Sequence, residues 1–414
     1  KMGLEREVLI GNTLVDLYAK CGLFDMAQET FHNLPSQDTV TWNALISGYA
    51  EHGYSDHALR CHEEALHEGV YMNAITVLKS CANLKAIAKG KELHAEIATK
   101  GLELEKFTAN MLINMYAKCG SLAEAQQIFD TLPCRDINSW NVVIEGYGSH
   151  AYYKEALDCF VHMHNEGCSP NTCTLICGLR ISIGMGCVNK GKEIHSDIIK
   201  MGLEGETLVA NTLVDMYGKN GLSAAAWKVH SSHPIRDVVS WTALLAGFVE
   251  HKRGEDALHC FEAMQHDSVS SNAVTLVCLL KACGMTQDGY SGQEIHQEVA
   301  RKGLENDIVI GNTLVDMYAK CGLLGTAQDM FDRLPIHDTV SWNVLLSGYA
   351  DNACDEEVLI CIEQLQHEGI HPNTATYVSS LKSCGNIGAA LKGQELHSAM
   401  VKQALERYPV IANT

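Results

Sequence analysis

A long internal repeat constrains the fold of this chain more than any other feature of its sequence. Asparagines in closely similar segments stand at positions 12, 110, 211, 312 and 413, so the sequence nearly repeats itself every 98 to 101 residues. A second series follows the same spacing, with tryptophans at 42, 140, 241 and 342. Each long period contains three related units of about 31, 35 and 35 residues, and such a period predicts a repeat architecture.

Each unit has the pattern of two amphipathic helices. In residues 8–20 (VLIGNTLVDLYAK) apolar residues recur at spacings of three and four, which is typical of a helix with one buried face. Gly22 follows where a left-handed C-cap belongs, and a second amphipathic stretch, 24–34, ends at Pro35. Because one hairpin cannot bury its apolar face alone, the pattern predicts an all-α protein, an α-solenoid with a concave surface.

The pentapeptide YAKCG occurs at 18–22, 116–120 and 318–322, with YGKNG at 217–221. Asn220 replaces the cysteine in the fourth copy, so nothing at this position requires a thiol. The 17 cysteines are scattered through amphipathic stretches of a 414-residue chain, which favours reduced, structural cysteines over a disulfide framework. We interpret the pentapeptide as the end of a first helix and its glycine turn.

The charge balance is acidic, with 31 Lys and Arg against 50 Asp and Glu and a net charge of −19. This balance disfavours non-specific binding to polyanions and to anionic membranes. No run of 18 or more apolar residues is present, so we expect no membrane span. The first residues lack the pattern of a signal or transit peptide, and we expect the chain to be part of a longer protein.

The alternating unit lengths resemble the pentatricopeptide repeat family, specifically its PLS subclass of land plants. The resemblance implies a right-handed superhelix and no cofactor. It divides the chain into S units at 8–38, 106–136, 207–237 and 308–338, P units at 39–73, 137–171, 238–272 and 339–373, and L units at 74–105, 172–206, 273–307 and 374–408. Residues 1–7 would end a partial L unit, and 409–414 would begin a truncated S unit. The tetratricopeptide repeat, the competing helical hairpin, has one constant period and fits these lengths poorly.

The resemblance implies that single-stranded RNA is read at one base per unit, by the fifth and last residues of that unit. A polar group at the start of the first helix and a second one at the end of the unit would suit this reading. The pairs are Asn12 and Asp38, Asn43 and Asn73, Asn110 and Asp136, Asn141 and Asn171, Asn211 and Asp237, Thr242 and Asn272, Asn312 and Asp338, and Asn343 and Asn373. N-capping of the next helix is the alternative role for the last residues, but it does not explain why S units end in Asp and P units in Asn.

The family's code implies that Asn with Asp favours U, Asn with Asn favours C, and Thr with Asn favours A. The expected site is then close to 5′-UCxUCxUAxUCx-3′, because the L units have apolar fifth residues such as Ile176, Val277 and Val378. The resemblance also implies that second residues sandwich the bases, here Leu9, Val40, Phe107, Leu208, Val239, Val309 and Val340, with Asn138 as an exception. It implies RNA phosphate contacts for Lys20, Lys118, Lys219 and Lys320, for which stabilisation of the helix dipole is the alternative role.

Two other groups of residues could suggest chemistry. The tryptophans could stack on bases, but each precedes a fifth residue and lies about 100° from it around the helix, so we expect packing instead. HAE at 94–96 and HQE at 296–298 match half of a zinc deaminase signature, but no C-x-x-C is present to complete the zinc ligands. Equivalent histidines three units apart are separated by roughly 25 to 30 Å and cannot share a metal ion.

These observations favour a non-enzymatic, monomeric RNA-binding module, and the family resemblance implies that it acts in a mitochondrion or chloroplast. The family resemblance implies that it supplies the specificity of a C-to-U RNA editing factor, with a deaminase-bearing or editing-accessory protein as a partner. One alternative is a protein-interaction scaffold, which the net charge of −19 supports. The other is a fragment of an editing enzyme whose deaminase domain lies beyond residue 414.

Overall fold

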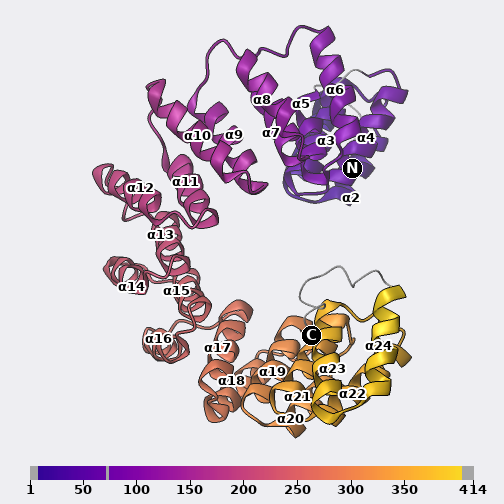
Figure 1. Ribbon diagram of the computed structural model, residues 1–414. Coiled ribbons are helices and arrows are strands. Elements are labelled where there is room, and N and C mark those ends of the chain that lie inside the picture. Colours follow the sequence, from indigo (N-terminus) through magenta and orange to yellow (C-terminus); the bar gives the residue numbers. More distant parts are fainter. Residues whose placement is uncertain (1–7, 71–73, 403–414) are drawn as a thin grey trace. The chain divides into compact units, whose positions relative to one another are not determined.

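The computed structural model describes residues 8–70 and 74–402, and every regular element within them is an α-helix. Consecutive helices pair as hairpins, each with an odd-numbered first helix and an even-numbered second helix (Figure 1). The first six hairpins contain α1 (Val8–Lys20), α2 (Phe24–His32), α3 (Thr39–Glu51), α4 (Ser55–His67), α5 (Ala74–Leu84), α6 (Ile87–Thr99), α7 (Lys106–Lys118), α8 (Leu122–Thr131), α9 (Ile137–Ser149), α10 (Tyr153–Asn165), α11 (Thr172–Gly184) and α12 (Val188–Lys200).

The other six hairpins contain α13 (Thr207–Lys219), α14 (Ser223–Ser232), α15 (Val238–Glu250), α16 (Gly254–His266), α17 (Ala273–Thr286), α18 (Gly289–Arg301), α19 (Ile308–Lys320), α20 (Leu324–Asp332), α21 (Thr339–Asp351), α22 (Asp355–His367), α23 (Thr374–Ile387) and α24 (Ala390–Lys402). Each first helix begins at the residue where a repeat unit inferred from the sequence begins. In the short L unit, α5 is two residues shorter than α11, its counterpart in the next L unit.

Two local signals set the ends of the first helices. At the start of α3, the Asp38 side chain accepts a hydrogen bond from the Thr41 N–H in a capping box, and Asp136, Asn171, Asn272, Asp338 and Asn373 cap their helices in the same way. Asp237 accepts from the Ser240 N–H without a capping box. At the end of α1, Gly22 takes a φ of 74°, which favours glycine and turns the chain into α2. The last residue of the S units, and of the P units that the structure describes there, therefore does act as an N-cap, whereas Glu105 and Glu206 at the ends of two L units do not.

The chain divides into two compact halves, residues 1–198 and 199–414, and each half is a stack of hairpins. In the first half α1 packs on α3, and the series continues through α5, α7, α9 and α11; in the second half the series runs from α13 to α23. Gly48 in α3 lies so close to Ala19 in α1 that a Cβ at residue 48 would overlap the alanine methyl. The alanine of YAKCG thus allows neighbouring first helices to approach closely, and the stack is an α-solenoid.

The four repeated tryptophans belong to the core, as the sequence predicts. Trp42, Trp140, Trp241 and Trp342 are at most 3% exposed. Three of them pack edge-on against a phenylalanine of the preceding second helix, at ring distances of 4.5 to 4.7 Å in Phe31–Trp42, Phe129–Trp140 and Phe331–Trp342. The histidines His94 and His296 hydrogen-bond the hydroxyls of Tyr116 and Tyr318, each at 2.8 Å, and so link neighbouring hairpins.

None of the helices in 8–70 and 74–402 combines the length and the apolar character that crossing a membrane would need. All 17 cysteines are free thiols. Burial raises the pKa of Cys61 and Cys260 to about 12, so these thiols are unreactive packing groups at neutral pH.

Candidate nucleic-acid interface

The fifth and last residues of the first repeat unit are joined by hydrogen bonds. The Asn12 amide donates from Nδ2 to both carboxylate oxygens of Asp38, at 3.1 and 3.3 Å. The hydroxyl of Thr41, the third residue of the next unit, donates to Asn12 Oδ1 at 2.7 Å. Hydrogen bonds from the backbone and side chain of Thr41, and then from Asn12, lower the pKa of Asp38. Both polar ends of the Asn12 amide are therefore occupied.

Two units with an asparagine at both positions show the same arrangement. Asn141 donates to Asn171 Oδ1 at 3.2 Å, and Thr174 donates to Asn141 Oδ1 at 2.6 Å. In the last P unit, Asn343 donates to Asn373 Oδ1 at 3.1 Å and Thr376 donates to Asn343 Oδ1 at 2.6 Å. In each case a threonine of the following helix holds the carbonyl end of the asparagine amide.

Three units have serine in place of this threonine, and their asparagines are held less completely. The Oδ1 atoms of Asn110, Asn211 and Asn312 are buried and have no hydrogen-bond partner. Asn211 still donates to Asp237, at 3.2 Å to each oxygen. Within the described residues no hydrogen bond joins Asn110 to Asp136 or Asn312 to Asp338. These two pairs, both expected to read U, are not bonded.

A lysine at the first position of one unit changes its reading pair. Lys106 Nζ lies 3.0 Å from Asp136 Oδ2. Lys106 is the first residue of its S unit, and the other S units begin with Val8, Thr207 and Ile308. Burial opposes ionisation of Asp136, but the Ser139 hydrogen bonds and the Lys106 ammonium outweigh it and lower its pKa to about 2. This contact was not predicted from the sequence, although the lysine at a position otherwise apolar or neutral is a visible signal.

The remaining pairs differ again. Thr242 shares a hydrogen bond of 2.8 Å with the Thr275 hydroxyl, and Asn272 caps α17. Asn43 has a buried Oδ1 without a partner, and Asn73 lies outside the described residues.

The second residues of the units form an exposed apolar set. Leu9 is 80% exposed and Phe107 is 66% exposed, and Val40, Leu208, Val239, Val309 and Val340 lie between 54% and 60%. Core residues of an amphipathic helix would be buried, so these side chains are free to contact a ligand. Val274, the second residue of an L unit, is 58% exposed as well, although the predicted set contains residues of S and P units only.

Three of the four lysines of the repeated pentapeptide are already paired with an acidic group. Lys20, Lys219 and Lys320 lie 2.7 to 3.0 Å from the aspartate one helical turn earlier, Asp16, Asp215 and Asp316. In the second S unit that position holds Asn114, and Lys118 has no ion pair among the described residues. The paired lysines offer a phosphate less net positive charge than Lys118 does.

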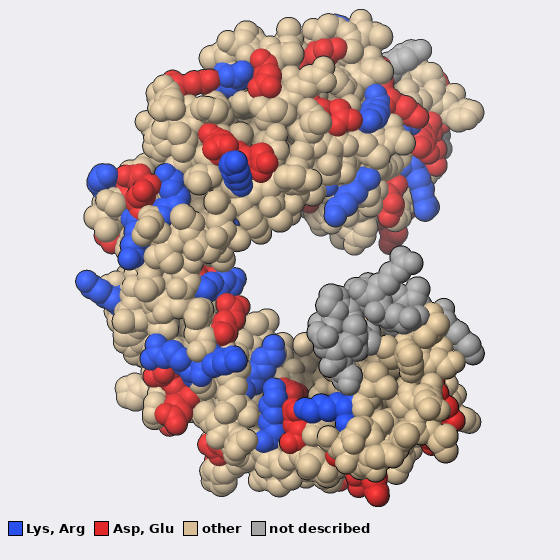
Figure 2. Space-filling model, in the orientation of Figure 1, with Lys and Arg blue, Asp and Glu red and all other residues tan. Residues whose placement is uncertain are grey.

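Acidic and basic side chains are interspersed on the face of the protein shown in Figure 2. This mixture agrees with the net charge of −19 and with the many i,i+3 and i,i+4 ion pairs along the helices. Recognition of an anionic ligand would therefore rest on the polar and apolar side chains of the first helices more than on a basic band.

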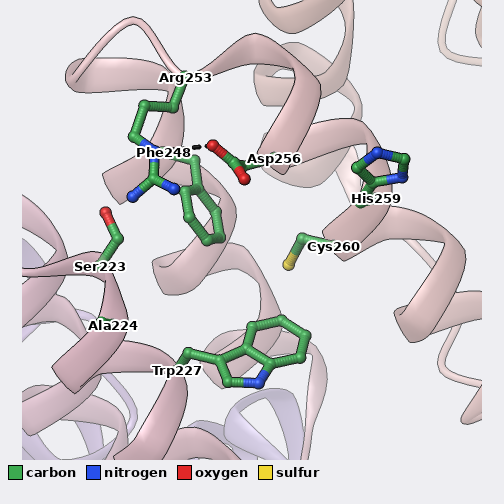
Figure 3. A pocket seen from close by; sticks show the side chains of 8 residues that line it. All are labelled: Ser223, Ala224, Trp227, Phe248, Arg253, Asp256, His259 and Cys260. Carbon is green, nitrogen blue, oxygen red and sulfur yellow. Dashed lines mark hydrogen bonds and ion pairs between the residues drawn. The ribbon is translucent and has the colours of Figure 1, made fainter.

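A cleft of about 400 Å³ lies away from the reading pairs, between α14, α15 and α16. It is lined by Ser223, Ala224, Trp227, Phe248, Arg253, Asp256, His259 and Cys260 (Figure 3). Trp227 and Phe248 replace a glutamine and a tyrosine that hydrogen-bond at the same place in other units, as in Gln126–Tyr147 and Gln328–Tyr349. The cleft contains none of the predicted base-reading residues.

His230, on the same α14 helix, stands where the other S units have phenylalanine. It is 1% exposed, and neither ring nitrogen has a hydrogen-bond partner. Its ring lies 4.2 Å from that of Trp241. Burial, reinforced by Arg236, lowers its pKa to about 4, so the histidine is neutral at pH 7.

Comparison with known proteins places these hairpins in a family. The model of the PPR repeat family matches residues 135–177 and 236–285, and the PPR repeat model matches 12–37, 40–70, 107–137, 312–336 and 340–370. The pentatricopeptide repeat-containing protein At3g20730 of Arabidopsis thaliana is 32% identical, and the match covers 94% of this chain and 70% of that protein. The chain belongs to the pentatricopeptide repeat family.

A second relative, the pentatricopeptide repeat-containing protein At4g39530 of Arabidopsis thaliana, is 32% identical over all of this chain and 50% of its own length. The chain thus spans about half the length of several curated pentatricopeptide repeat relatives that it matches. Among solved structures, the pentatricopeptide repeat protein PPR10 from maize aligns with a TM-score of 0.60 at 22% identity, covering 97% of this chain and 64% of that one. Another structure of PPR10, in complex with an 18-nt psaJ RNA element, aligns with a TM-score of 0.57 at 21% identity, covering 95% of this chain and 64% of that one. These alignments agree with the helical-repeat solenoid.

Proposed function

We propose that this chain binds single-stranded RNA in a sequence-specific manner, at one base per hairpin. The observation that carries the proposal is the combination found on the first helices. A bonded polar pair at the fifth and last positions, as in Asn12 and Asp38, accompanies an exposed apolar second residue, as in Leu9. Hydrogen bonding to a base edge and apolar contact with a base face are the two contacts that reading an unpaired base requires.

The proposed site is 5′-UCxUCxUAxUCx-3′, with the chain running amino to carboxyl along RNA from 5′ to 3′. The residues proposed to read bases are the eight pairs that end with Asn343 and Asn373, and the sandwiching residues are the seven that begin with Leu9. Lys118 is proposed as the strongest phosphate contact because no acidic side chain neutralises it within the described residues. The RNA complex of the maize protein, a protein of the same fold, supports this class of ligand.

We further propose that the chain is a PLS-type array that acts in an organelle and supplies the specificity of an RNA editing factor. Relatives named chloroplastic and mitochondrial support an organellar location without favouring one organelle. Catalysis on a cytidine would belong to another domain or a recruited protein. Sequence beyond residue 414 that contains H-x-E and P-C-x-x-C would instead assign the deaminase to the same polypeptide.

The direct test is the affinity of the purified chain for a 12-mer with the proposed site and for a scrambled 12-mer of the same composition. We expect the proposed site to bind tighter by roughly 10³-fold or more, as specific nucleic-acid sites do. Equal, weak binding to both would refute RNA reading and favour the protein-interaction scaffold, for which the net charge of −19 is the supporting observation.

A variant tests the register of the proposed site. Replacing Thr242 with Asn while Asn272 is kept should shift the preference at the eighth nucleotide from A toward C. The shift should be roughly 1 to 3 kcal/mol, the size of other base-specific contacts. An unchanged preference at this nucleotide, in a chain that still prefers the proposed site, would show that the register is wrong.

A further inference from the structure

The third residue of the following unit divides six of the seven reading asparagines into two groups. Asn43 is the exception, because Thr76 follows it and its Oδ1 is nevertheless buried without a partner. Where it is threonine, at Thr41, Thr174 and Thr376, its hydroxyl donates to the asparagine Oδ1 at 2.6 to 2.7 Å. Where it is serine, at Ser139, Ser240 and Ser341, the Oδ1 of Asn110, Asn211 and Asn312 is buried without a partner. The two groups do not follow the expected base code, because Asn12 and Asn211 are both paired with Asp, and both are expected to read U, but they fall in different groups.

The serine hydroxyls are engaged elsewhere. Ser139 and Ser341 donate only to their own cap aspartates, at 2.8 and 3.0 Å, and Ser240 donates to the backbone carbonyl of Asp237 at 2.8 Å. Threonine carries a methyl group on Cβ that restricts χ1. In this fold the threonine hydroxyl lies between two acceptors, the asparagine Oδ1 of the preceding unit at 2.6 to 2.7 Å and its own cap side chain at 2.8 to 3.1 Å.

The hydrogen bond to Oδ1 decides which end of the asparagine amide faces outward. With the carbonyl oxygen held by threonine, Nδ2 must face the last residue of the unit, and the amide presents N–H groups alone to a base. Without that donor the buried oxygen is unpaired, which is unfavourable. Asn110 and Asn312, which also lack a bond to the last residue of their units, can then turn their amides over, whereas Asn211 still donates to Asp237 and is held through Nδ2 alone. A turned amide would accept from a base amino group instead of donating to a base oxygen or ring nitrogen.

We propose that this third residue is a positioning residue for base selection, a role that rests on the proposed function. Where threonine holds Oδ1, it fixes the preceding asparagine as a hydrogen-bond donor, and where serine stands instead that oxygen is not held. Units read through Asn12, Asn141 and Asn343 therefore discriminate sharply among bases, and units read through Asn110, Asn211 and Asn312 discriminate weakly. Neither group differs from the other at the fifth position, so the difference in selectivity comes from the neighbouring helix.

A reciprocal exchange tests the proposal. Thr174→Ser should weaken selectivity at the fifth nucleotide, and Ser240→Thr should sharpen it at the seventh. Each variant and the unmodified chain are measured against four 12-mers that differ only at the nucleotide concerned. The ratio between the best and second-best base should change by roughly three- to tenfold, as the net contribution of one hydrogen bond allows. The ratio at the other nucleotide is the internal control and should not change.

A second variant, Thr174→Val, removes the hydroxyl and keeps the branched shape, so it should relax selectivity at least as much as serine does. Thermal melting of each variant, followed by circular dichroism, shows whether the fold is kept. Since the Ser240→Thr exchange adds a residue already present at this position in other units, it gives a result even where a Thr174 variant does not fold.

The outcomes separate the two proposals. If the unmodified chain does not distinguish the proposed 12-mer from the scrambled one, the proposed function fails. If it does, but the variants weaken all four 12-mers equally or leave the base ratios unchanged, the threonine is only a helix cap and this inference is overturned. A change of ratio confined to the fifth nucleotide for Thr174 variants and to the seventh for Ser240→Thr supports it.

Discussion

The hairpins α1–α2 and α7–α8 contain the same two candidate reading residues and hold them differently. In the first, Asn12, Asp38 and Thr41 form a closed set of hydrogen bonds. In the second, the carboxylate of Asp136 forms an ion pair with Lys106 and accepts a hydrogen bond from the Ser139 N–H of the helix that it caps. Asn110 Oδ1 has no partner. The identities of the fifth and last residues therefore do not determine how these side chains are hydrogen-bonded, because neighbouring groups such as Lys106 compete for the same oxygens.

The largest expected effect comes from exchanging the last residue of each hairpin. Asp38→Asn should shift the preference at the first nucleotide from U toward C by roughly 1 to 3 kcal/mol, with the fold intact because Asn caps as well as Asp. Asp136→Asn should shift the fourth nucleotide less, since Lys106 already occupies one of its oxygens. Binding of 12-mers with each base at these nucleotides measures both shifts, and equal shifts would contradict the comparison.

Removing the lysine should make the second hairpin resemble the first more closely. Lys106→Thr releases the Asp136 carboxylate and should raise the preference for U at the fourth nucleotide by roughly three- to tenfold. The matched control is Thr207→Lys, which places a lysine at the equivalent position of the third S unit and should lower the preference for U at the seventh nucleotide. If both variants change selectivity in the same direction, the ion pair does not govern reading.

The short hairpins also differ in packing, which gives a stability test. His230→Phe restores the residue that Phe31, Phe129 and Phe331 provide elsewhere, and it removes two buried ring nitrogens without partners. We expect a gain of about 1 kcal/mol in the free energy of unfolding at pH 7, measured by urea denaturation.

The pH dependence of this gain follows from the pKa of His230, which the fold lowers from its ordinary value to about 4. Below about pH 6.5 the unfolded chain binds a proton at this residue and the folded chain does not, so stability falls as the pH is lowered toward 4. The gain from His230→Phe should therefore grow between pH 6.5 and pH 4. A gain that is independent of pH would show that the histidine titrates equally in both states.

The smallest expected effect concerns the lysines. The salt dependence of RNA binding should be shallow. The slope of the logarithm of the binding constant against the logarithm of salt concentration should be about −3 or shallower, from four phosphate contacts at about 0.7 each. Lys118→Ala should reduce the slope by about 0.7, and Lys219→Ala should reduce it less because Asp215 already neutralises that lysine. A slope near −8 would show that most phosphate contacts lie elsewhere.

Much of the fold could be predicted from the sequence because its signals are local. The spacing of apolar residues, the glycine of YAKCG and the Asp or Asn before each first helix act within a few residues, and the helices of the structure begin where these signals stand. The packing role of the tryptophans followed from the helical period and is confirmed by their burial. The positions of the candidate reading residues came from a resemblance, and their role stays a proposal.

What the sequence by itself determined is the helix–turn–helix repeat and the identity of the polar residues at each position. Only the tertiary structure decided which of those residues are bonded to one another. The Thr41 hydroxyl reaches Asn12 because α1 and α3 pack together, and Lys106 takes the Asp136 oxygen because the end of one unit folds back over the start of its own first helix. Such bonds depend on the side-chain rotamer and on the distance between neighbouring helices, and neither is written in the spacing of residues along the chain.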